Sequence, residues 1–308
     1  MVNASDEQGI SSLMYAASTN EQPLVIGALV KAGAEINARD RDGMTPLMFA
    51  ASNNPNPDVL AALLASGASI GEKDNAGLTP FAYAASNNPH PEVLRRLVAA
   101  GADIGARDKY GMTPFMYAAT NNPSREVITF LLQAGAELNN RDSRGWTALD
   151  CAAASNQSTE VLEALLEAGA DPRQRDDNGE TPLMHAVARN ENPQISAALL
   201  AAGVEVKARD SRGWTALIYA ASYAQDPAIV QALLDAGADV ADQDAAGMTV
   251  LMHAASTNQN PVVLSKLMDA GADPHGKSAE GLTAFDYAQK NKMIKGTQVY
   301  WDLNDAQY

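Results

Sequence analysis

A glycine recurs along the whole chain at a constant spacing of 34 residues. The series has no insertion or deletion and consists of Gly9, Gly43, Gly77, Gly111, Gly145, Gly179, Gly213, Gly247 and Gly281. A second glycine series, from Gly33 to Gly271, keeps the same period. A fixed repeat of roughly 20 to 50 residues is typical of a solenoid, in which each unit packs only on its neighbours. The sequence therefore predicts a linear stack that presents a long surface.

Each unit carries the signals of two short helices. A threonine such as Thr45 precedes Pro, Ala or Val and supplies an N-cap for a first helix, whose alanines allow close packing. The asparagine that ends this helix, for example Asn54, predicts a left-handed C-cap. A second cap such as Asn56 precedes a helix with an amphipathic Val-Leu-x-x-Leu-Leu face over residues 59–64. That second helix is expected to end at the second glycine.

These features together resemble the ankyrin repeat, whose unit carries Thr-Pro-Leu-His-x-Ala and a later Gly-Ala. The likeness covers essentially the whole chain, and the Asn-Pro-x-Pro turn of the 34-residue unit is most similar to bacterial ankyrin proteins. The resemblance implies an all-α solenoid of stacked helix-turn-helix units joined by extended β-turn loops. We expect one array over residues 1–308, with units that start near residues 6, 40, 74, 108, 142, 176, 210 and 244 and a C-terminal capping repeat over 278–308.

The chain departs from the family pattern at the signature histidine. This position instead holds Met14, Met48, Ala82, Met116, Asp150, Met184, Ile218, Met252 and Asp286. The hydrogen bonds that the histidine makes between units of the family are therefore not carried over to this chain.

Large apolar residues occupy most positions directly after the first glycine of each unit. The resemblance implies that turn tips and first helices line a concave groove that binds a protein partner. Because Trp and Met side chains at such positions are typical interface anchors, we expect them to be exposed and to contact a protein or peptide. The candidates in this row are Met44, Leu78, Met112, Trp146, Trp214 and Met248. Packing of each side chain on the next turn is the alternative.

The turn tips and helix ends vary most in the middle of the chain, where we expect further partner contacts. The candidates there are Tyr110, Arg144, Arg189, Arg212 and Tyr223. In the same region, residues 141–149 and 209–217 share the sequence Arg-Asp-Ser-Arg-Gly-Trp-Thr-Ala-Leu. This identity indicates a copied block of two units.

A row of basic residues occupies one position of the repeat and is followed in most units by an aspartate. Its members are Arg39, Lys73, Arg107, Arg141, Arg175, Arg209 and Lys277, with Gln243 as the exception. We interpret the row as a charge ladder that ties adjacent turns together. Recognition of an acidic peptide by arginine forks is the alternative.

A column of mostly large side chains occupies another repeat position. It comprises Tyr15, Phe49, Tyr83, Tyr117, Cys151, His185, Tyr219, His253 and Tyr287. We interpret it as core packing between helices, with Cys151 as a structural thiol. Since His185 and His253 lie two units apart, roughly 20 Å at about 10 Å per stacked helix pair, they cannot share a metal ion.

Composition and motifs favour a binding module over an enzyme. With a net charge of −15, nucleic acids and anionic membranes are not expected as main partners. The sequence contains no phosphate-binding glycine loop, catalytic triad order or zinc spacing, so we expect no cofactor and no metal. A small-ligand-binding protein or an enzyme is the alternative of another class. The single cysteine leaves the compartment open, either the cytoplasm or, after removal of an export signal, the periplasm or the cell exterior.

The two ends of the chain differ. Polar residues over 289–295 replace apolar ones, as in a capping repeat, and a last helix over Thr297–Asn304 is expected to close the stack. The residues available for this closure are Val299, Tyr300, Trp301 and Leu303. Residues 2–5 match the tail of a repeat, so we expect further residues before this start and fraying or self-association through an uncapped N-terminal face. A structural segment of a larger assembly is therefore an alternative function.

Overall fold

The computed structural model describes residues 2–306, and this range contains 18 α-helices and no strand beyond isolated bridges. The helices follow one another in pairs, one pair per repeat. They are α1 (Ser12–Thr19), α2 (Pro23–Lys31), α3 (Pro46–Asn53), α4 (Pro57–Ala65), α5 (Pro80–Asn87), α6 (Pro91–Ala99), α7 (Pro114–Asn121), α8 (Arg125–Gln133), α9 (Ala148–Ser155), α10 (Thr159–Glu167), α11 (Pro182–Arg189), α12 (Pro193–Ala201), α13 (Ala216–Tyr223), α14 (Pro227–Asp235), α15 (Val250–Thr257), α16 (Pro261–Asp269), α17 (Ala284–Ala288) and α18 (Gln298–Asp305).

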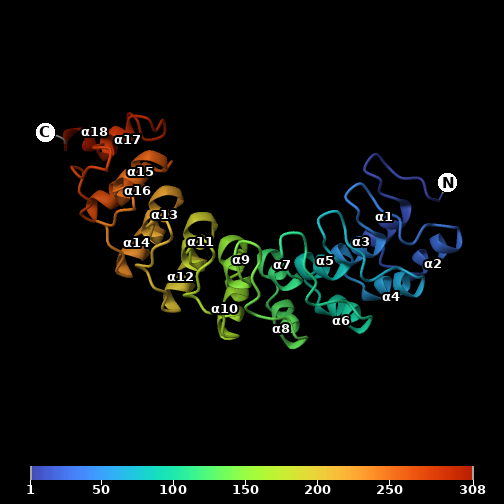
Figure 1. The fold of residues 1–308 in the computed structure, drawn as a ribbon. Helices are drawn as coiled ribbons and strands as arrows, with labels where there is room; N and C mark the ends of the chain where they lie inside the picture. Colours follow the sequence, from blue (N-terminus) through green and yellow to red (C-terminus); the bar gives the residue numbers. More distant parts are fainter. Residues whose placement is uncertain (1, 307–308) are drawn as a thin grey trace. The chain divides into compact units, whose positions relative to one another are not determined.

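The chain divides into two compact units. Unit 1 comprises Met1–Ala152 and Glu163–Ala170, and unit 2 comprises Ala153–Leu162 and Asp171–Tyr308. Within unit 1 the first helices α1, α3, α5 and α7 stack side by side, and α2, α4, α6 and α8 form a second row (Figure 1). Unit 2 repeats this arrangement with α11, α13, α15 and α17 in one row and α12, α14, α16 and α18 in the other. The fold is the stacked helical solenoid that the sequence predicts, whereas a single array over 1–308 stays a prediction.

The first helices begin at the predicted hydroxyl caps. Thr45 Oγ1 accepts a hydrogen bond from the main-chain N–H of Met48 at 3.4 Å, and the Met48 sulfur in turn lies 3.4 Å from the Thr45 nitrogen. In the repeat with Asp150 at the signature position, the carboxylate accepts from both the N–H and the hydroxyl of Thr147. Replacement of the family histidine by methionine or aspartate therefore preserves a reciprocal cap at the start of the helix.

Small side chains in the first helices and branched ones in the second helices form the core. In α3, Ala50 and Ala51 are fully buried, which brings neighbouring first helices close together. In α4, the apolar face of Val59, Leu60 and Leu63 is also fully buried. Complete burial of one such branched side chain contributes about 1.5–3 kcal/mol. The same burial recurs in successive repeats and stabilises both unit 1 and unit 2.

The asparagines that end most of the first helices do not adopt the predicted left-handed conformation. Asn88 has φ −93° and ψ 116°, which is extended backbone. Its Nδ2 donates to the main-chain oxygens of Ala51 at 3.2 Å and Asn54 at 2.9 Å, and its Oδ1 accepts from the N–H of His90 at 3.1 Å. The prediction was wrong because one amide here satisfies three buried or half-buried main-chain groups, and that requirement outweighs the local turn preference of asparagine.

We call this series of bonds the asparagine ladder. Its amides reach residues 37 and 34 positions earlier in the chain. Members that make both bonds include Asn54, Asn88, Asn122, Asn190 and Asn258. In the last repeat Asn291 plays the same part and donates to Ala255 and Asn258. The position of the ladder between Asn190 and Asn258 is occupied by Ala224.

The regular glycines lie at turns that touch the next turn. Gly77 has φ +98°, and a Cβ atom there would lie 3.1 Å from the nitrogen of Lys109. The Lys109 N–H donates to the main-chain oxygen of Ala76 at 3.2 Å, one of a series of bonds that link successive turns. Both the left-handed φ and the close approach explain why only glycine occurs at this position.

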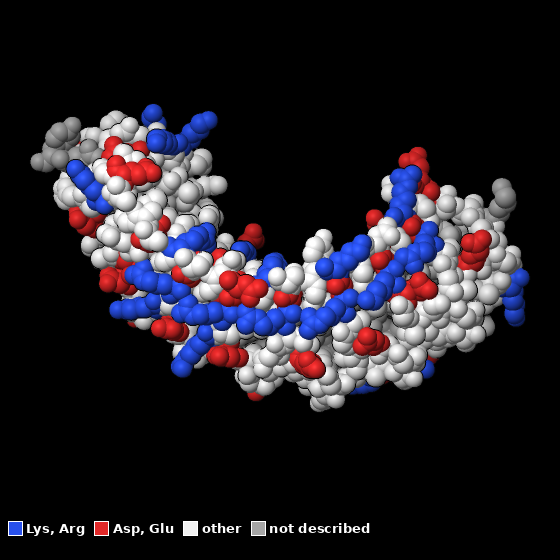
Figure 2. Space-filling model, viewed as in Figure 1, with Lys and Arg blue, Asp and Glu red and all other residues white. Residues whose placement is uncertain are grey.

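The basic row also links successive turns, as predicted, through main-chain oxygens and through ion pairs such as Arg39–Glu72 and Arg175–Glu205. Lys73 Nζ donates to the oxygen of Arg107 at 3.0 Å, and Arg107 Nη1 donates to the oxygen of Arg141 at 2.9 Å. The guanidinium groups of Arg39, Arg175 and Arg209 likewise reach the residue 34 positions later. Figure 2 shows Lys and Arg side chains gathered in rows with acidic side chains nearby. The aspartates that follow the basic row accept main-chain N–H groups of their own turns.

The last helix of unit 2 buries three of the four residues predicted to close the stack, whereas a capping repeat over 278–308 stays a prediction. Helix α18 begins after its cap Thr297, and it buries Val299, Tyr300 and Leu303. Trp301 is 52% exposed, so it does not take part in the closure expected of it. Residues 307–308 of the predicted capping repeat lie outside the described residues.

At the N-terminal end, residues 2–5 have the contacts of a repeat tail. Asn3 Nδ2 donates to the main-chain oxygen of Gly33 at 3.0 Å, and its Oδ1 accepts from the N–H of Glu35 at 3.0 Å. Asn37 makes the same two bonds one repeat later. Residues 2–5 therefore match the end of a repeat in their hydrogen bonds as well as in their sequence.

Candidate functional site

The apolar row after the first glycines is not an exposed row. Trp146 is only 9% exposed, and the other five candidates of this row are half-buried. Successive turns are hydrogen-bonded to one another, so side chains that follow the glycines are largely covered. The expected exposure was therefore wrong, and partner contact by Met44, Leu78, Met112, Trp146, Trp214 and Met248 stays a hypothesis.

The other candidates do reach solvent. Tyr110 is 64% exposed and Tyr223 is 46% exposed. The side chains of Arg144, Arg189 and Arg212 are each about half exposed. Tyr110 and Arg144 lie on turns of unit 1, whereas Arg189, Arg212 and Tyr223 converge in unit 2.

Aromatic rings and an arginine form a cluster in unit 2, which we call the arginine–aromatic cluster: Arg212, Trp214, Tyr219, Tyr223 and His253. The Arg212 guanidinium carbon lies 4.5 Å from the centroid of the Trp214 ring. The Trp214 ring meets His253 edge-on at 4.5 Å and Tyr219 edge-on at 5.1 Å, and it stacks on Tyr223 at 6.3 Å. Such aromatic pairs contribute about 0.5–1.5 kcal/mol each beyond the area that they bury. The rings are therefore held in fixed positions.

Buried carboxylates hold the polar edge of this cluster. The Tyr219 hydroxyl donates to Glu180 Oε1 at 2.6 Å and lies 3.0 Å from Asp210 Oδ2. The Arg212 guanidinium reaches the same two carboxylates at 3.2 Å and 3.1 Å. Burial and the hydrogen bond to Glu180 raise the pKa of Tyr219 above its ordinary value, so its hydroxyl stays a donor. Because these contacts restrain the Arg212 guanidinium, its remaining N–H groups are presented in one orientation.

The column of large side chains is only partly the core that we expected. Cys151 and His253 are buried, but the His253 Nε2 lies 2.9 Å from Asp244 Oδ2. Tyr83 is half-buried, and its hydroxyl donates to Asp74 Oδ2 at 2.7 Å. The same tyrosine–aspartate bond recurs in other repeats. The column therefore connects each first helix to the aspartate that organises its turn.

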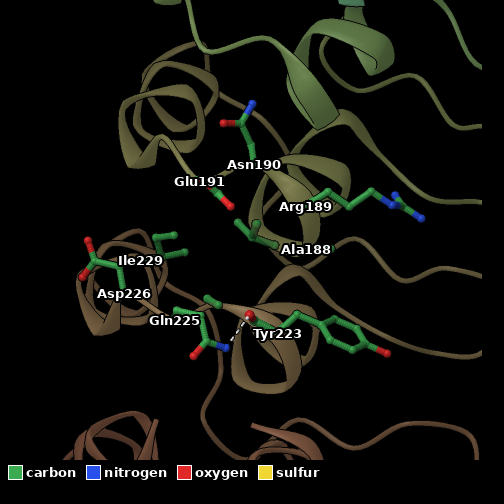
Figure 3. A pocket seen from close by; sticks show the side chains of 10 residues that line it. Ala188, Arg189, Asn190, Glu191, Tyr223, Gln225, Asp226 and Ile229 are labelled. Atoms are coloured by element: carbon green, nitrogen blue, oxygen red, sulfur yellow. Dashed lines mark hydrogen bonds between the residues drawn. The ribbon is translucent and has the colours of Figure 1, made fainter. Parts of the chain in front are cut away.

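Two hollows adjoin Arg189 and Tyr223. The first has a volume of about 320 Å³ and is lined by Glu180, Ala188, Arg189, Arg212, Tyr219 and Tyr223. The second has a volume of about 420 Å³ and lies at the ends of α11 and α13 (Figure 3). Figure 3 shows Arg189 and Tyr223 pointing to one side, with Asp226 and Ile229 on the opposite side. Because Ala188, Arg189 and Tyr223 line both hollows, the two recesses are neighbours.

Family models confirm the repeat type. A model described as "Ankyrin repeats (3 copies)" matches residues 81–176 and 152–244. A second model, "Ankyrin repeats (many copies)", matches residues 29–84 and 221–288. This chain belongs to the ankyrin repeat family. No curated protein matches the chain in a sequence comparison.

Ankyrin repeats are generally protein–protein interaction modules, and proteins built from them are typically non-enzymatic scaffolds. No partner or binding groove follows from membership alone. Within residues 2–306 of this ankyrin repeat chain, every helix is too short or too polar to traverse a lipid bilayer.

One group of this ankyrin repeat chain has the residue types of a metal site. Asp176, Glu180 and His185 are buried, and their potential ligand atoms lie within 4.8 Å of one another. The Arg189 Nη1 lies 2.6 Å from His185 Nδ1 and 3.8 Å from Glu180 Oε2. Since a guanidinium only donates, His185 Nδ1 accepts and its Nε2–H faces Asp176 Oδ2 at 3.3 Å. Arg189 thus supplies the positive charge that a metal ion would supply.

The charge state of Asp176 fits this arrangement. Burial acts to raise the pKa of Asp176, but the adjacent His185 and hydrogen bonds from two main-chain N–H groups outweigh it and leave the pKa below its ordinary value. Asp176 and Glu180 were not predicted from the sequence as members of a site. A signal was present, because Glu180 is the one charged residue in the otherwise apolar row after the glycines.

Proposed function

We propose that the chain is a non-enzymatic protein-binding module that contacts its partner around Arg189, Arg212 and Tyr223 of unit 2. The observation that supports this proposal is the arginine–aromatic cluster, whose exposed side chains are held by buried partners. Tyr, Trp and Arg are the residues most enriched in interface hot spots. A hollow of about 320 Å³ between these side chains offers a place for a partner side chain.

Pre-organisation is the physical advantage of this surface. Immobilising a flexible side chain on binding costs about 0.5–1.5 kcal/mol. Arg212 is already restrained by Glu180, Asp210 and the face of Trp214, and Arg189 by His185. A partner that presents carbonyl or carboxylate oxygens to their outer N–H groups therefore meets donors that are already ordered. The basic row is a weaker candidate for recognising an acidic peptide, because its donors reach main-chain oxygens.

Substitutions by the residue found in other repeats test the proposal. Asn53, Asn87 and Asn121 occupy the equivalent helix position in unit 1, so Arg189→Asn and Tyr223→Asn are expected to preserve the fold. A partner captured from the source cell with the immobilised chain should bind either variant about 10- to 1,000-fold more weakly, which corresponds to about 1–4 kcal/mol.

Two further variants locate the contact. Val262→Ala changes a residue that is 53% exposed on α16, away from the cluster, and should leave affinity unchanged. Tyr110→Ala tests the candidate on unit 1. Wild-type affinity of Tyr223→Asn and Arg189→Asn would contradict the proposal, as would an equal loss of affinity in Val262→Ala.

A further inference from the structure

The asparagine ladder has a gap within unit 2. Asn190 and Asn258 each donate to two main-chain oxygens of the preceding repeat, at 2.8–3.0 Å. Between them lies Ala224, which is 5% exposed and has no amide. Its equivalent acceptors, by the ladder spacing of 37 and 34, are the oxygens of Val187 and Asn190. Among residues 2–306, no side chain donates a hydrogen bond to either oxygen.

The gap also removes an acceptor. The N–H of Asn192 donates to Asn190 Oδ1 at 2.9 Å, and the N–H of Asn260 donates to Asn258 Oδ1 at 2.8 Å. Ala224 has no side-chain oxygen that could accept from the N–H of Asp226 in the same way. In this repeat, therefore, the oxygens of Val187 and Asn190 and the N–H of Asp226 have no side-chain amide to bond with, whereas the equivalent groups of the neighbouring repeats do.

A second donor is missing beside the first. Asn192 and Asn260 donate their Nδ2 atoms to the main-chain oxygens of Gln157 and Gln225 at 2.8 Å and 2.7 Å. Asp226 occupies this position in the intervening repeat, and an ionised carboxylate has no proton to donate. The equivalent oxygen belongs to Glu191. At both Ala224 and Asp226, this repeat therefore lacks the side-chain donor that the neighbouring repeats have.

The residues that carry these groups line the hollow of about 420 Å³ at the ends of α11 and α13. Its lining includes Val187, Asn190, Glu191, Ala224 and Asp226. Figure 3 shows Glu191 and Ala188 on one side of the hollow and Asp226 and Ile229 across from them. The lining thus combines apolar side chains such as Ile229 with the residues that carry these main-chain groups.

We propose that this hollow binds a primary carboxamide, carried by an Asn or Gln side chain of the protein partner. The NH₂ group of a carboxamide supplies two donors for the oxygens of Val187 and Asn190, and its oxygen accepts from the N–H of Asp226. The chain itself places a carboxamide there in the neighbouring repeats. An ammonium group suits the acidic rim of Glu191 and Asp226 but has no acceptor for the N–H. A carboxylate has no donor for the oxygens.

This inference rests on the proposed function, because the hollow shares Arg189 and Tyr223 with the proposed partner surface. It specifies one chemical group that the partner must present. The partner does not have to be known for the test, since propionamide carries the same group as an Asn or Gln side chain.

The test is an NMR titration of the full chain with propionamide, and with propylammonium and propionate as matched ions. Propionamide should shift the main-chain amide signals of Ala224 and Asp226 in a saturable way, at roughly millimolar concentrations for so small a ligand. The Ala224→Asn variant restores the ladder residue, so it should show a higher Tm and lose the propionamide response. Larger shifts with propylammonium, or an unchanged response in Ala224→Asn, would overturn the inference.

The stability of Ala224→Asn and the propionamide response of Tyr223→Asn provide two further checks. An Ala224→Asn chain that is less stable than the wild type would show that the gap does not have the ladder geometry, and it would overturn the inference as well. Tyr223→Asn should retain the propionamide response, because the ring of Tyr223 makes none of the hydrogen bonds to the amide. Failure of the titration leaves the partner-affinity test of Tyr223→Asn unaffected, so the two proposals can fail separately.

Discussion

Removal of one ladder asparagine should destabilise unit 1 by far more than removal of its neighbour. Asn88 is 1% exposed and makes hydrogen bonds of 3.2, 2.9 and 3.1 Å to main-chain groups. Each typical bond contributes about 0.5–1.5 kcal/mol net, and each buried group left unpaired costs about 1–3 kcal/mol. Water entering the space left by Asn88→Ala would recover part of this loss. We therefore expect a destabilisation of about 2–4 kcal/mol.

Urea unfolding followed by circular dichroism measures this loss, and hydrogen exchange shows whether it is confined to the repeats around α5. The matched control is Asn87→Ala. Asn87 is exposed and donates only to Ser52 Oγ at 2.8 Å, so its removal should cost less than about 1 kcal/mol. Equal stability of the two variants would refute our explanation that asparagine occurs at position 88 because of its ladder bonds and not because it ends a helix.

Three further predictions concern the turns, the thiol and pH. Gly77→Ala should cost about 1–3 kcal/mol in urea unfolding, and more than Gly101→Ala, because both have positive φ but only the first Cβ approaches another turn. Burial raises the pKa of Cys151 to about 12, so Ellman's reagent should react with this thiol at pH 8 only after unfolding, and rapid reaction of the native chain would contradict its burial. Burial also lowers the pKa of His253 below its ordinary 6.5 despite the nearby Asp244. The unfolded chain then binds the proton more readily, so stability should fall as pH drops through about 6.5, and His253→Tyr should flatten the urea midpoint against pH. An unchanged slope in that variant would count against the assignment.

Much of the fold could be predicted from periodicity. The constant glycine spacing, the Thr-Pro starts and the Val-Leu-x-x-Leu-Leu faces are local signals, and the helices begin where those signals place them. The asparagines that end most first helices were located correctly, but their conformation was predicted wrongly. Its bonding partners lie 34 and 37 residues away, and their position depends on how closely adjacent repeats pack. The conformational propensity of a residue reflects its own turn only and carries no information about partners that are so far away in the chain.

In the candidate site, too, some features could be predicted from the sequence and others depend on packing between repeats. Sequence variation at the turn tips and helix ends pointed to Arg189, Arg212 and Tyr223, which the structure brings together. Exposure could not be predicted, because the covering of Trp146 depends on its neighbours in space. The buried carboxylate of Glu180 was visible as an irregularity in an apolar row. Its role beneath Arg212 and Tyr219 appears only once two successive repeats are placed in contact.

The bonds between repeats constrain how a gene for such a chain can change. Basic side chains reach residues 34 positions ahead, and the asparagine amides reach 34 and 37 positions back. Insertion or loss of a whole block of 34 codons leaves all of these registers intact, whereas loss of a single codon displaces them together. The identical sequences at 141–149 and 209–217 are what copying of whole blocks produces. The number of repeats is thus free to vary during evolution, while the length of each one is not.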